Sequence, residues 1–146
     1  MQLDIILRTH DQGSLHWREV KHLKKEITQR CVNSLLRAIV DGIDLTIVDD
    51  HSSPGTLVLL GDVIHLKDTG NNASLKKAFE LAADSKADLV YLVEDDYLHY
   101  PHAISEAMET FEYFQKMSSK EDICLNLVDC PANYRQWQPQ FPGRDC

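Results

Sequence analysis

The sequence predicts a doubly wound α/β fold with a mostly parallel sheet, and three observations support this class. Short β-rich segments alternate with amphipathic helical segments, which is the order that builds βαβ units. One segment, Leu89–Val93, is apolar throughout, as in a parallel strand that is buried on both faces. Polar side chains gather directly after several of the expected strands, where open α/β sheets bind ligands.

The first third of the chain contains a strand, a helix and a second strand. Leu3–Arg8 is short and rich in β-branched and apolar residues, which predicts the first strand. Residues 14–25 are polar and ambiguous, and we interpret them as a long, partly helical loop. From Glu26 onward apolar residues recur on one helical face, until a turn that contains glycine ends the helix. Asp44–Asp49 predicts the second strand, parallel to the first.

The rest of the chain repeats this alternation and then becomes irregular. The expected segments are 56–60 (a short helix), 62–66 (a weak strand), 73–85 (a helix), 89–93 (the buried strand), a helix that starts at Pro101, and 123–128 (the last strand). In the helix at 73–85 the buried stripe is expected to be Leu75, Ala78, Phe79 and Ala82. All 146 residues are expected to form a single domain, with an irregular tail at about residues 129–146.

The composition argues against two classes of function. A net charge of −8 disfavours nucleic-acid binding, because affinity for a phosphate backbone requires concentrated Lys and Arg. The longest apolar runs are about five residues, far below the roughly 20 that a membrane-spanning helix needs. Since the N-terminus also lacks the basic region of a signal peptide, we expect a cytoplasmic protein. The four cysteines are scattered without a CxxC pair, which predicts reduced thiols.

Three adjacent carboxylates, Glu94, Asp95 and Asp96, follow the buried strand. Because such side chains repel one another, a hard divalent cation is a common way to stabilise them, although a solvated acidic turn also explains the pattern. Two further polar loops, Thr9–Asp11 and Asp49–Ser52, follow the first and second strands. Three such loops at one edge of a parallel sheet predict a binding site for a nucleotide and a metal ion.

These motifs, in this order, resemble those of the family 2 glycosyltransferases of the GT-A type. Leu3–Asp11 is similar to the family's opening strand and the turn after it, and Ile47–Ser53 is similar to its Val-Asp-Asp-Gly-Ser turn. Glu94–Asp96, followed by Pro101, resembles the family's acidic metal motif. The resemblance covers about residues 3–104. It implies the GT-A architecture, the Rossmann-like fold of nucleotide-diphospho-sugar transferases.

The resemblance also implies roles for individual residues. Asp50 would accept a hydrogen bond from the imide N–H of a uracil-type base or contact the ribose, and Thr9 would line the same pocket. Asp96 would bind Mn²⁺ or Mg²⁺ directly, and the metal would bridge the two phosphates of a sugar nucleotide. Asp95 would reach the ribose or a water molecule near the metal. Glu94 is either the first carboxylate of an acid-x-acid pair that binds the metal, or a group that contacts the metal ligands without binding the metal itself.

The same resemblance assigns His10, Asp11 and Ser52 to the nucleotide site, because they belong to the matching turns. His10 stands where an aromatic residue is common, and either stacking on the base or capping of the turn explains it. The family's usual Arg-Asn pair near the start of a helix is absent, so Lys76 either replaces the charge that faces phosphate or is a solvated helix lysine. Asp129 is the candidate general base, although capping of a strand end also explains it.

We therefore expect a metal-dependent glycosyltransferase that moves a sugar from a nucleoside diphosphate sugar to a hydroxyl of a glycan, lipid or protein. UDP is the expected nucleotide, and the transfer is expected to invert the configuration of the sugar. Family members usually continue well beyond this length, into an acceptor pocket. The alternative is therefore a short or truncated module that binds a nucleotide sugar without transferring it. A nucleotidyltransferase is disfavoured, because Thr9–Gly13 contains no Lys or Arg that could bind a triphosphate.

Overall fold

The computed structural model describes residues 1–12, 24–117 and 124–125 of the chain. The chain divides into two compact units, Met1–Ser105 and Glu106–Cys146. The whole described β-sheet lies in the first unit. No helix of the described part is both long and apolar enough to cross a membrane.

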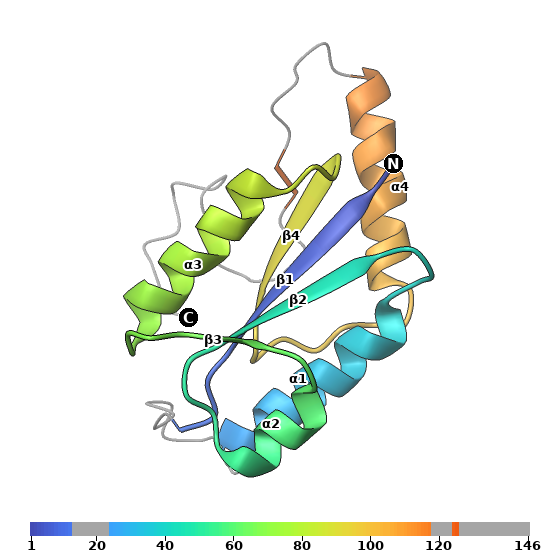
Figure 1. Ribbon diagram of the computed structural model, residues 1–146. Helices are drawn as coiled ribbons and strands as arrows, with labels where there is room; N and C mark the ends of the chain where they lie inside the picture. Colours follow the sequence, from blue (N-terminus) through green and yellow to red (C-terminus); the bar gives the residue numbers. More distant parts are fainter. Residues whose placement is uncertain (13–23, 118–123, 126–146) are drawn as a thin grey trace, which may run out of the picture. The chain divides into compact units, whose positions relative to one another are not determined.

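The first unit is built on a four-stranded sheet whose strands all run parallel (Figure 1). The strands are β1 (Leu3–Thr9), β2 (Asp44–Asp49), β3 (Ile64–His65) and β4 (Leu89–Glu94), in the spatial order β3-β2-β1-β4. Parallel neighbours need a crossover connection, and a helix lies in each of the three connections. The predicted α/β class with a parallel sheet is therefore confirmed, and the arrangement is compatible with a Rossmann-like fold.

Helices cover both faces of this sheet. α1 (Lys24–Ala38) and α2 (Pro54–Leu60) connect β1 to β2 and β2 to β3, whereas α3 (Asn71–Asp84) carries the chain back across the sheet to β4. Because crossovers between parallel strands are right-handed, this reversal puts α3 on the face opposite α1 and α2. Figure 1 shows α3 on one side of the strands and α1 with α2 on the other. A fourth helix, α4 (Ala103–Met117), begins in the first unit and continues into the second.

The central strand β1 is buried on both faces, and its alternating side chains divide between the two helical layers. Ile6 packs with Val48 and Ala78 on the α3 side of the sheet. Ile5 and Leu7 are fully buried and point to the opposite face, because successive strand residues alternate. Burial of each such side chain stabilises the fold by about 1.5–3 kcal/mol. Apolar packing on both faces therefore fixes the position of β1, including its carboxyl end.

Two expectations about buried faces are wrong. Phe79, expected on the buried stripe of α3, is 54% exposed. The helix instead buries Ser74 and Ala78, and Phe79 lies about 100° further round its axis. β4, expected to be buried on both faces, buries Val93 but leaves Leu92 36% exposed. Among the described residues β4 pairs with β1 alone, so it forms an edge of the sheet.

Several expected segments lie wholly or mostly beyond the described residues. They are the loop at 14–25, of which the structure describes the last two residues as the start of α1, and the tail at 129–146. The last strand was expected at 123–128, and its two described members, Cys124 and Leu125, are not in a strand.

Candidate functional site

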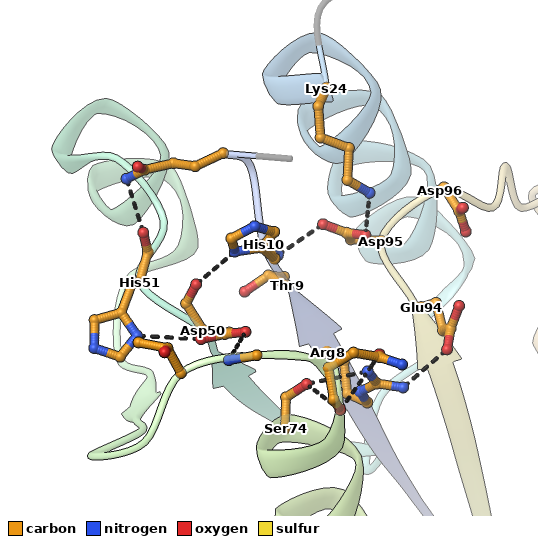
Figure 2. A pocket seen from close by; sticks show the side chains of 14 residues that line it. Arg8, Thr9, His10, Lys24, Asp50, His51, Ser74, Glu94, Asp95 and Asp96 are labelled. Atoms are coloured by element: carbon orange, nitrogen blue, oxygen red, sulfur yellow. Dashed lines mark hydrogen bonds and ion pairs between the residues drawn. The ribbon is translucent and has the colours of Figure 1, made fainter. Parts of the chain in front are cut away.

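A cavity of about 510 Å³ opens at the carboxyl ends of β1, β2 and β4, within the first unit. From β1 the chain proceeds to β2 and β3 on one side of the sheet, whereas β4 lies on the other side of β1. The direction of winding therefore reverses between β1 and β4, and doubly wound sheets bind ligands in the crevice at such a switch point. The volume also lies within the usual range for small-molecule sites. The starts of α1 and α3 complete the walls (Figure 2).

The structure brings together six of the predicted site residues. Those that line the cavity are Thr9, His10, Asp50, Glu94, Asp95 and Asp96. They come from the turns that follow β1, β2 and β4, so the three polar loops do meet at one edge of the sheet.

Asp95 is buried and connects β1, β4 and α1. Its carboxylate accepts hydrogen bonds from the His10 N–H and the Thr28 hydroxyl, both at 2.8 Å. The Lys24 ammonium pairs with the other oxygen at 2.5 Å. Figure 2 shows Asp95 turned toward Lys24 and His10. Since both carboxylate oxygens have protein partners, Asp95 holds three elements together around the cavity.

Asp50 is buried and joins the turn after β2 to the start of α3. Its carboxylate accepts the Gly70 N–H at 2.8 Å and lies 3.1 Å from Nδ1 of His51. The Asp50 N–H donates to the Thr9 carbonyl at 2.9 Å, and the Asp50 carbonyl lies 2.7 Å from Nδ1 of His10. His10 thus links the turn after β1 to the turns after β2 and β4. A carboxylate offers about four lone-pair sites, so Asp50 retains the capacity to accept a ligand N–H.

Arg8 places a largely buried guanidinium in the cavity wall. It donates to Oε1 of Glu94 at 2.8 Å, to Oγ of Ser74 at 3.0 Å, and to the backbone and side-chain oxygens of Asn71. Figure 2 shows Arg8 reaching from β1 toward the end of β4 and the start of α3. Because arginine does not lose its charge in proteins, this wall of the cavity is permanently positive.

Glu94 and Asp96 are the exposed carboxylates of the cavity. The Glu94 side chain is 55% exposed and uses one oxygen for Arg8, whereas Asp96 forms no hydrogen bond or ion pair with another described residue. Proteins bind Mg²⁺ through one or two carboxylates together with phosphate and water oxygens, so these two side chains suit such an ion. Among the described residues, no group of three His, Cys, Asp or Glu side chains is arranged to hold a metal.

Two predicted residues, Asp11 and Ser52, lie in the turns but do not line the cavity. Asp11 accepts hydrogen bonds from the N–H and the hydroxyl of Ser53, at 2.7 and 2.5 Å, and from the Thr56 hydroxyl, and so anchors the start of α2. Burial alone raises the pKa of Asp11, but these hydrogen bonds together lower the pKa below its ordinary value. Ser52 donates its N–H to Asp49 at 3.0 Å.

The last two predicted residues are not placed in the cavity either. The Lys76 side chain is 78% exposed and pairs with Glu80 at 3.8 Å, one turn along α3. It does not line the cavity, so the interpretation as a solvated helix lysine fits the structure. Asp129, the candidate general base, lies outside the described residues.

A buried thiol and a phenol lie close to the end of β4 without offering a nucleophile. Sγ of Cys31 is 3.4 Å from the Glu94 carbonyl oxygen, to which it donates. Burial raises the pKa of Cys31 to about 12 and the pKa of Tyr91 to about 12. Both groups are therefore protonated at neutral pH, and since the thiolate is the reactive form, Cys31 is a packing residue.

Several cavity residues were not assigned from the sequence: Arg8, Gln12, Lys24, His51, Thr69, Gly70, Asn71 and Ser74. Arg8 did carry a signal, because it directly follows the apolar run Ile5–Leu7 near the end of the strand and precedes a polar turn. A guanidinium in that position must find acceptors nearby. Lys24 carried none, because it lies in a run of basic residues and gains its place only by pairing with Asp95.

Comparisons with family models, with curated proteins and with solved structures find no match to this chain. The structure shows an α/β unit with an all-parallel sheet and a charged cavity at its switch point. Any inference about a ligand therefore depends on the chemistry of that cavity and on the motifs of the sequence.

Proposed function

We propose that this chain binds a nucleoside diphosphate sugar, with UDP as the expected nucleotide, and transfers the sugar to an acceptor hydroxyl with inversion in the presence of Mn²⁺ or Mg²⁺. The observation that carries the proposal is the cavity at the switch point, where two buried aspartates, two basic groups and two exposed carboxylates meet. The GT-A architecture and the transfer reaction rest on the resemblance of the motifs to family 2 glycosyltransferases. A cytoplasmic location remains part of the proposal.

The charges of the cavity favour a diphosphate only together with a cation. The carboxylates that line it are those of Asp50, Glu94, Asp95 and Asp96, and the basic groups are those of Arg8 and Lys24. With the histidines neutral, negative charge is in excess by two. A diphosphate would add to that excess, so a divalent ion is needed to make its binding favourable. Bound between Glu94, Asp96 and the phosphates, the ion would stabilise the charge of the leaving nucleoside diphosphate.

The base of the nucleotide would bind on the Asp50 side of the cavity. Asp50 is 4% exposed, and its carboxylate retains sites that can accept the imide N–H of a uracil-type base. A hydrogen bond in such a dry environment is stronger than in water and discriminates against bases that lack the donor. Thr9 lines the same part of the cavity. For the acceptor, a hydroxyl of a glycan, lipid or protein, Asp129 is the candidate general base.

Isothermal titration of UDP into the whole chain, with and without Mn²⁺, tests the binding part of the proposal. We expect Mn²⁺ to strengthen UDP binding at least tenfold, and the D96N variant to lose most of this gain because it lacks a metal ligand. The matched control is D84N, which removes an exposed carboxylate at the opposite end of α3 from the cavity. It should bind UDP as the wild type does.

The outcomes separate the proposal from its rivals. If neither UDP nor any other nucleotide binds in either condition, the proposal is wrong. If UDP binds but a panel of UDP-sugars is neither hydrolysed nor used with any acceptor, the chain is a binding module without turnover. If D96N retains the full effect of Mn²⁺, the metal is not held by Asp96.

A further inference from the structure

The largely buried cation of the cavity, Arg8, sits in a position that the strand register sets. It is the penultimate residue of β1 and lies directly between Val48 of β2 and Glu94 of β4. Its side chain points to the α3 side of the sheet, because Ile6, two residues earlier, packs there. The Arg8 guanidinium therefore reaches the junction between the end of β4 and the start of α3 (Figure 2).

The counter-ion of Arg8, Glu94, is much more exposed to solvent than Arg8 itself. The Arg8 side chain is 11% exposed, whereas the Glu94 side chain is 55% exposed. The other partners of Arg8 among the described residues, Asn71 and Ser74, are neutral. Nε of Arg8 is buried without a hydrogen-bond partner among the described residues. A permanently charged group on the cavity wall thus has a single counter-ion among the described residues, and that counter-ion is solvated.

The surroundings of Arg8 favour an anion. α3 begins beside it, no side chain of the described residues caps this helix, and its first turn contains no acidic residue. The first turn of α3 therefore supplies no carboxylate of its own to the positive end of the helix dipole, and the carboxylate that does reach it, Asp50, is hydrogen-bonded to the Gly70 N–H. The N-cap residue, Gly70, has a φ of +107°, and a Cβ built on it would meet nothing within 4 Å, so the backbone there is open to a ligand. Guanidinium groups bind phosphate through two parallel hydrogen bonds.

We propose that Arg8 binds a phosphate group of the ligand and that Glu94 is the counter-ion it exchanges for that phosphate. In the ligand-free protein Glu94 partly satisfies Arg8. When a phosphate takes its place, the Glu94 carboxylate is free to turn to the divalent cation. The inference rests on the proposed function for the nucleotide, but the phosphate contact applies to inorganic pyrophosphate as well. It assigns to Arg8 the phosphate-facing charge that was one of the two interpretations of Lys76, which pairs with Glu80 outside the cavity.

The proposed exchange of Glu94 for phosphate predicts opposite effects of the E94Q substitution without and with a metal ion. Without a metal, the E94Q variant should bind inorganic pyrophosphate several-fold more tightly than the wild type, because the phosphate no longer competes with a carboxylate for Arg8. With Mn²⁺ present, E94Q should bind pyrophosphate more weakly than the wild type, because a ligand of the cation is lost. The matched control is E80Q, which removes an exposed, ion-paired carboxylate outside the cavity.

Isothermal titrations of pyrophosphate, UDP and uridine, each with and without Mn²⁺, test the role of Arg8. R8M should weaken binding of pyrophosphate and UDP at least tenfold in Mn²⁺, the size expected for lost charge-assisted hydrogen bonds, and should leave uridine binding unchanged. R8K keeps the positive charge, so we expect it to keep the fold. It should weaken the binding of pyrophosphate and of UDP several-fold. The matched control is K77M, which removes a partly exposed, ion-paired lysine of α3 that does not line the cavity. Circular dichroism checks that every variant is folded.

The results distinguish a failure of this inference from a failure of the proposed function. If pyrophosphate does not bind to the wild type, or if it binds to R8M as tightly as to the wild type, the phosphate contact is overturned. An E94Q variant that binds pyrophosphate no more tightly than the wild type without Mn²⁺ overturns the exchange. If UDP binds with Mn²⁺ and is unaffected by R8M, the inference fails and the proposed function stands. If Arg8 binds pyrophosphate, but UDP binds no more tightly than pyrophosphate and uridine does not bind, the inference stands. The proposal that the ligand contains uridine is then wrong.

Discussion

Replacing Asp95 by Asn should destabilise the protein by about 3 kcal/mol, because it breaks the buried ion pair that joins β4 to α1. The carboxylate of Asp95 is 9% exposed and the Lys24 side chain is 14% exposed, so the pair is largely shielded from water. An asparagine can leave its carbonyl oxygen with the His10 N–H and the Thr28 hydroxyl. Its NH₂ group then faces the Lys24 ammonium, and a donor meets a donor.

The expected loss of unfolding free energy follows from leaving the Lys24 ammonium without its counter-ion. Removing one partner of a buried ion pair costs about 3–5 kcal/mol, because the remaining charge is left without compensation. Lys24 keeps a little access to water, so we expect the lower end of that range. Because small domains are stable by about 5–15 kcal/mol in total, such a loss is easily measured.

Urea unfolding followed by circular dichroism measures the free energy of unfolding of each variant. The control is E80Q, whose carboxylate is 51% exposed in its ion pair and should change stability by less than about 0.5 kcal/mol. Adding K24M to D95N should recover at least about 1 kcal/mol, because the uncompensated ammonium is removed. A D95N variant within about 0.5 kcal/mol of the wild type, or a double variant less stable than D95N, refutes this account of the pair.

Two further predictions concern His99 and Gly70. Burial lowers the pKa of His99, so the unfolded chain takes up a proton first as the pH falls below the ordinary value of 6.5. The stability that neutral His99 contributes is therefore full above that pH and is lost as the pH falls through the lower pKa of the folded state. Between pH 7.5 and 5 the wild type should lose more unfolding free energy than H99F, and equal losses would contradict the shift. G70A should cost about 1–2 kcal/mol in urea unfolding, because φ is +107° at the N-cap of α3 and a side chain is strained there. A loss below about 0.5 kcal/mol would show that this turn relaxes freely.

The order and type of the elements were accessible from the sequence, because hydrophobic periodicity is a local property. The strands at the start of the chain, at Asp44–Asp49 and at Leu89–Glu94 were predicted within one or two residues, as were the helices between them. Their spacing also required parallel pairing. Once the strands are parallel, the turns at their carboxyl ends must share an edge of the sheet, so the meeting of three polar loops was predictable too.

Helix rotation and strand position were less accessible. The predicted stripe of α3 included Phe79, although the helix turns Ser74 and Ala78 to the sheet. Adjacent apolar residues such as Ala78 and Phe79 differ by about 100° around a helix, and composition alone does not choose between them. β4 looked like a central strand because it is apolar, but it pairs only with β1 among the described residues.

The sequence by itself determined that carboxylates would gather at the end of a parallel sheet, since that follows from local pattern and chain direction. Only the tertiary structure decided what each charge does. Arg8 and Glu94 are 86 residues apart and meet because the β1–β4 register places them side by side. Asp95, in the turn directly after β4, pairs instead with Lys24 at the start of α1. Partners of this kind are set by register and packing, which no local segment contains.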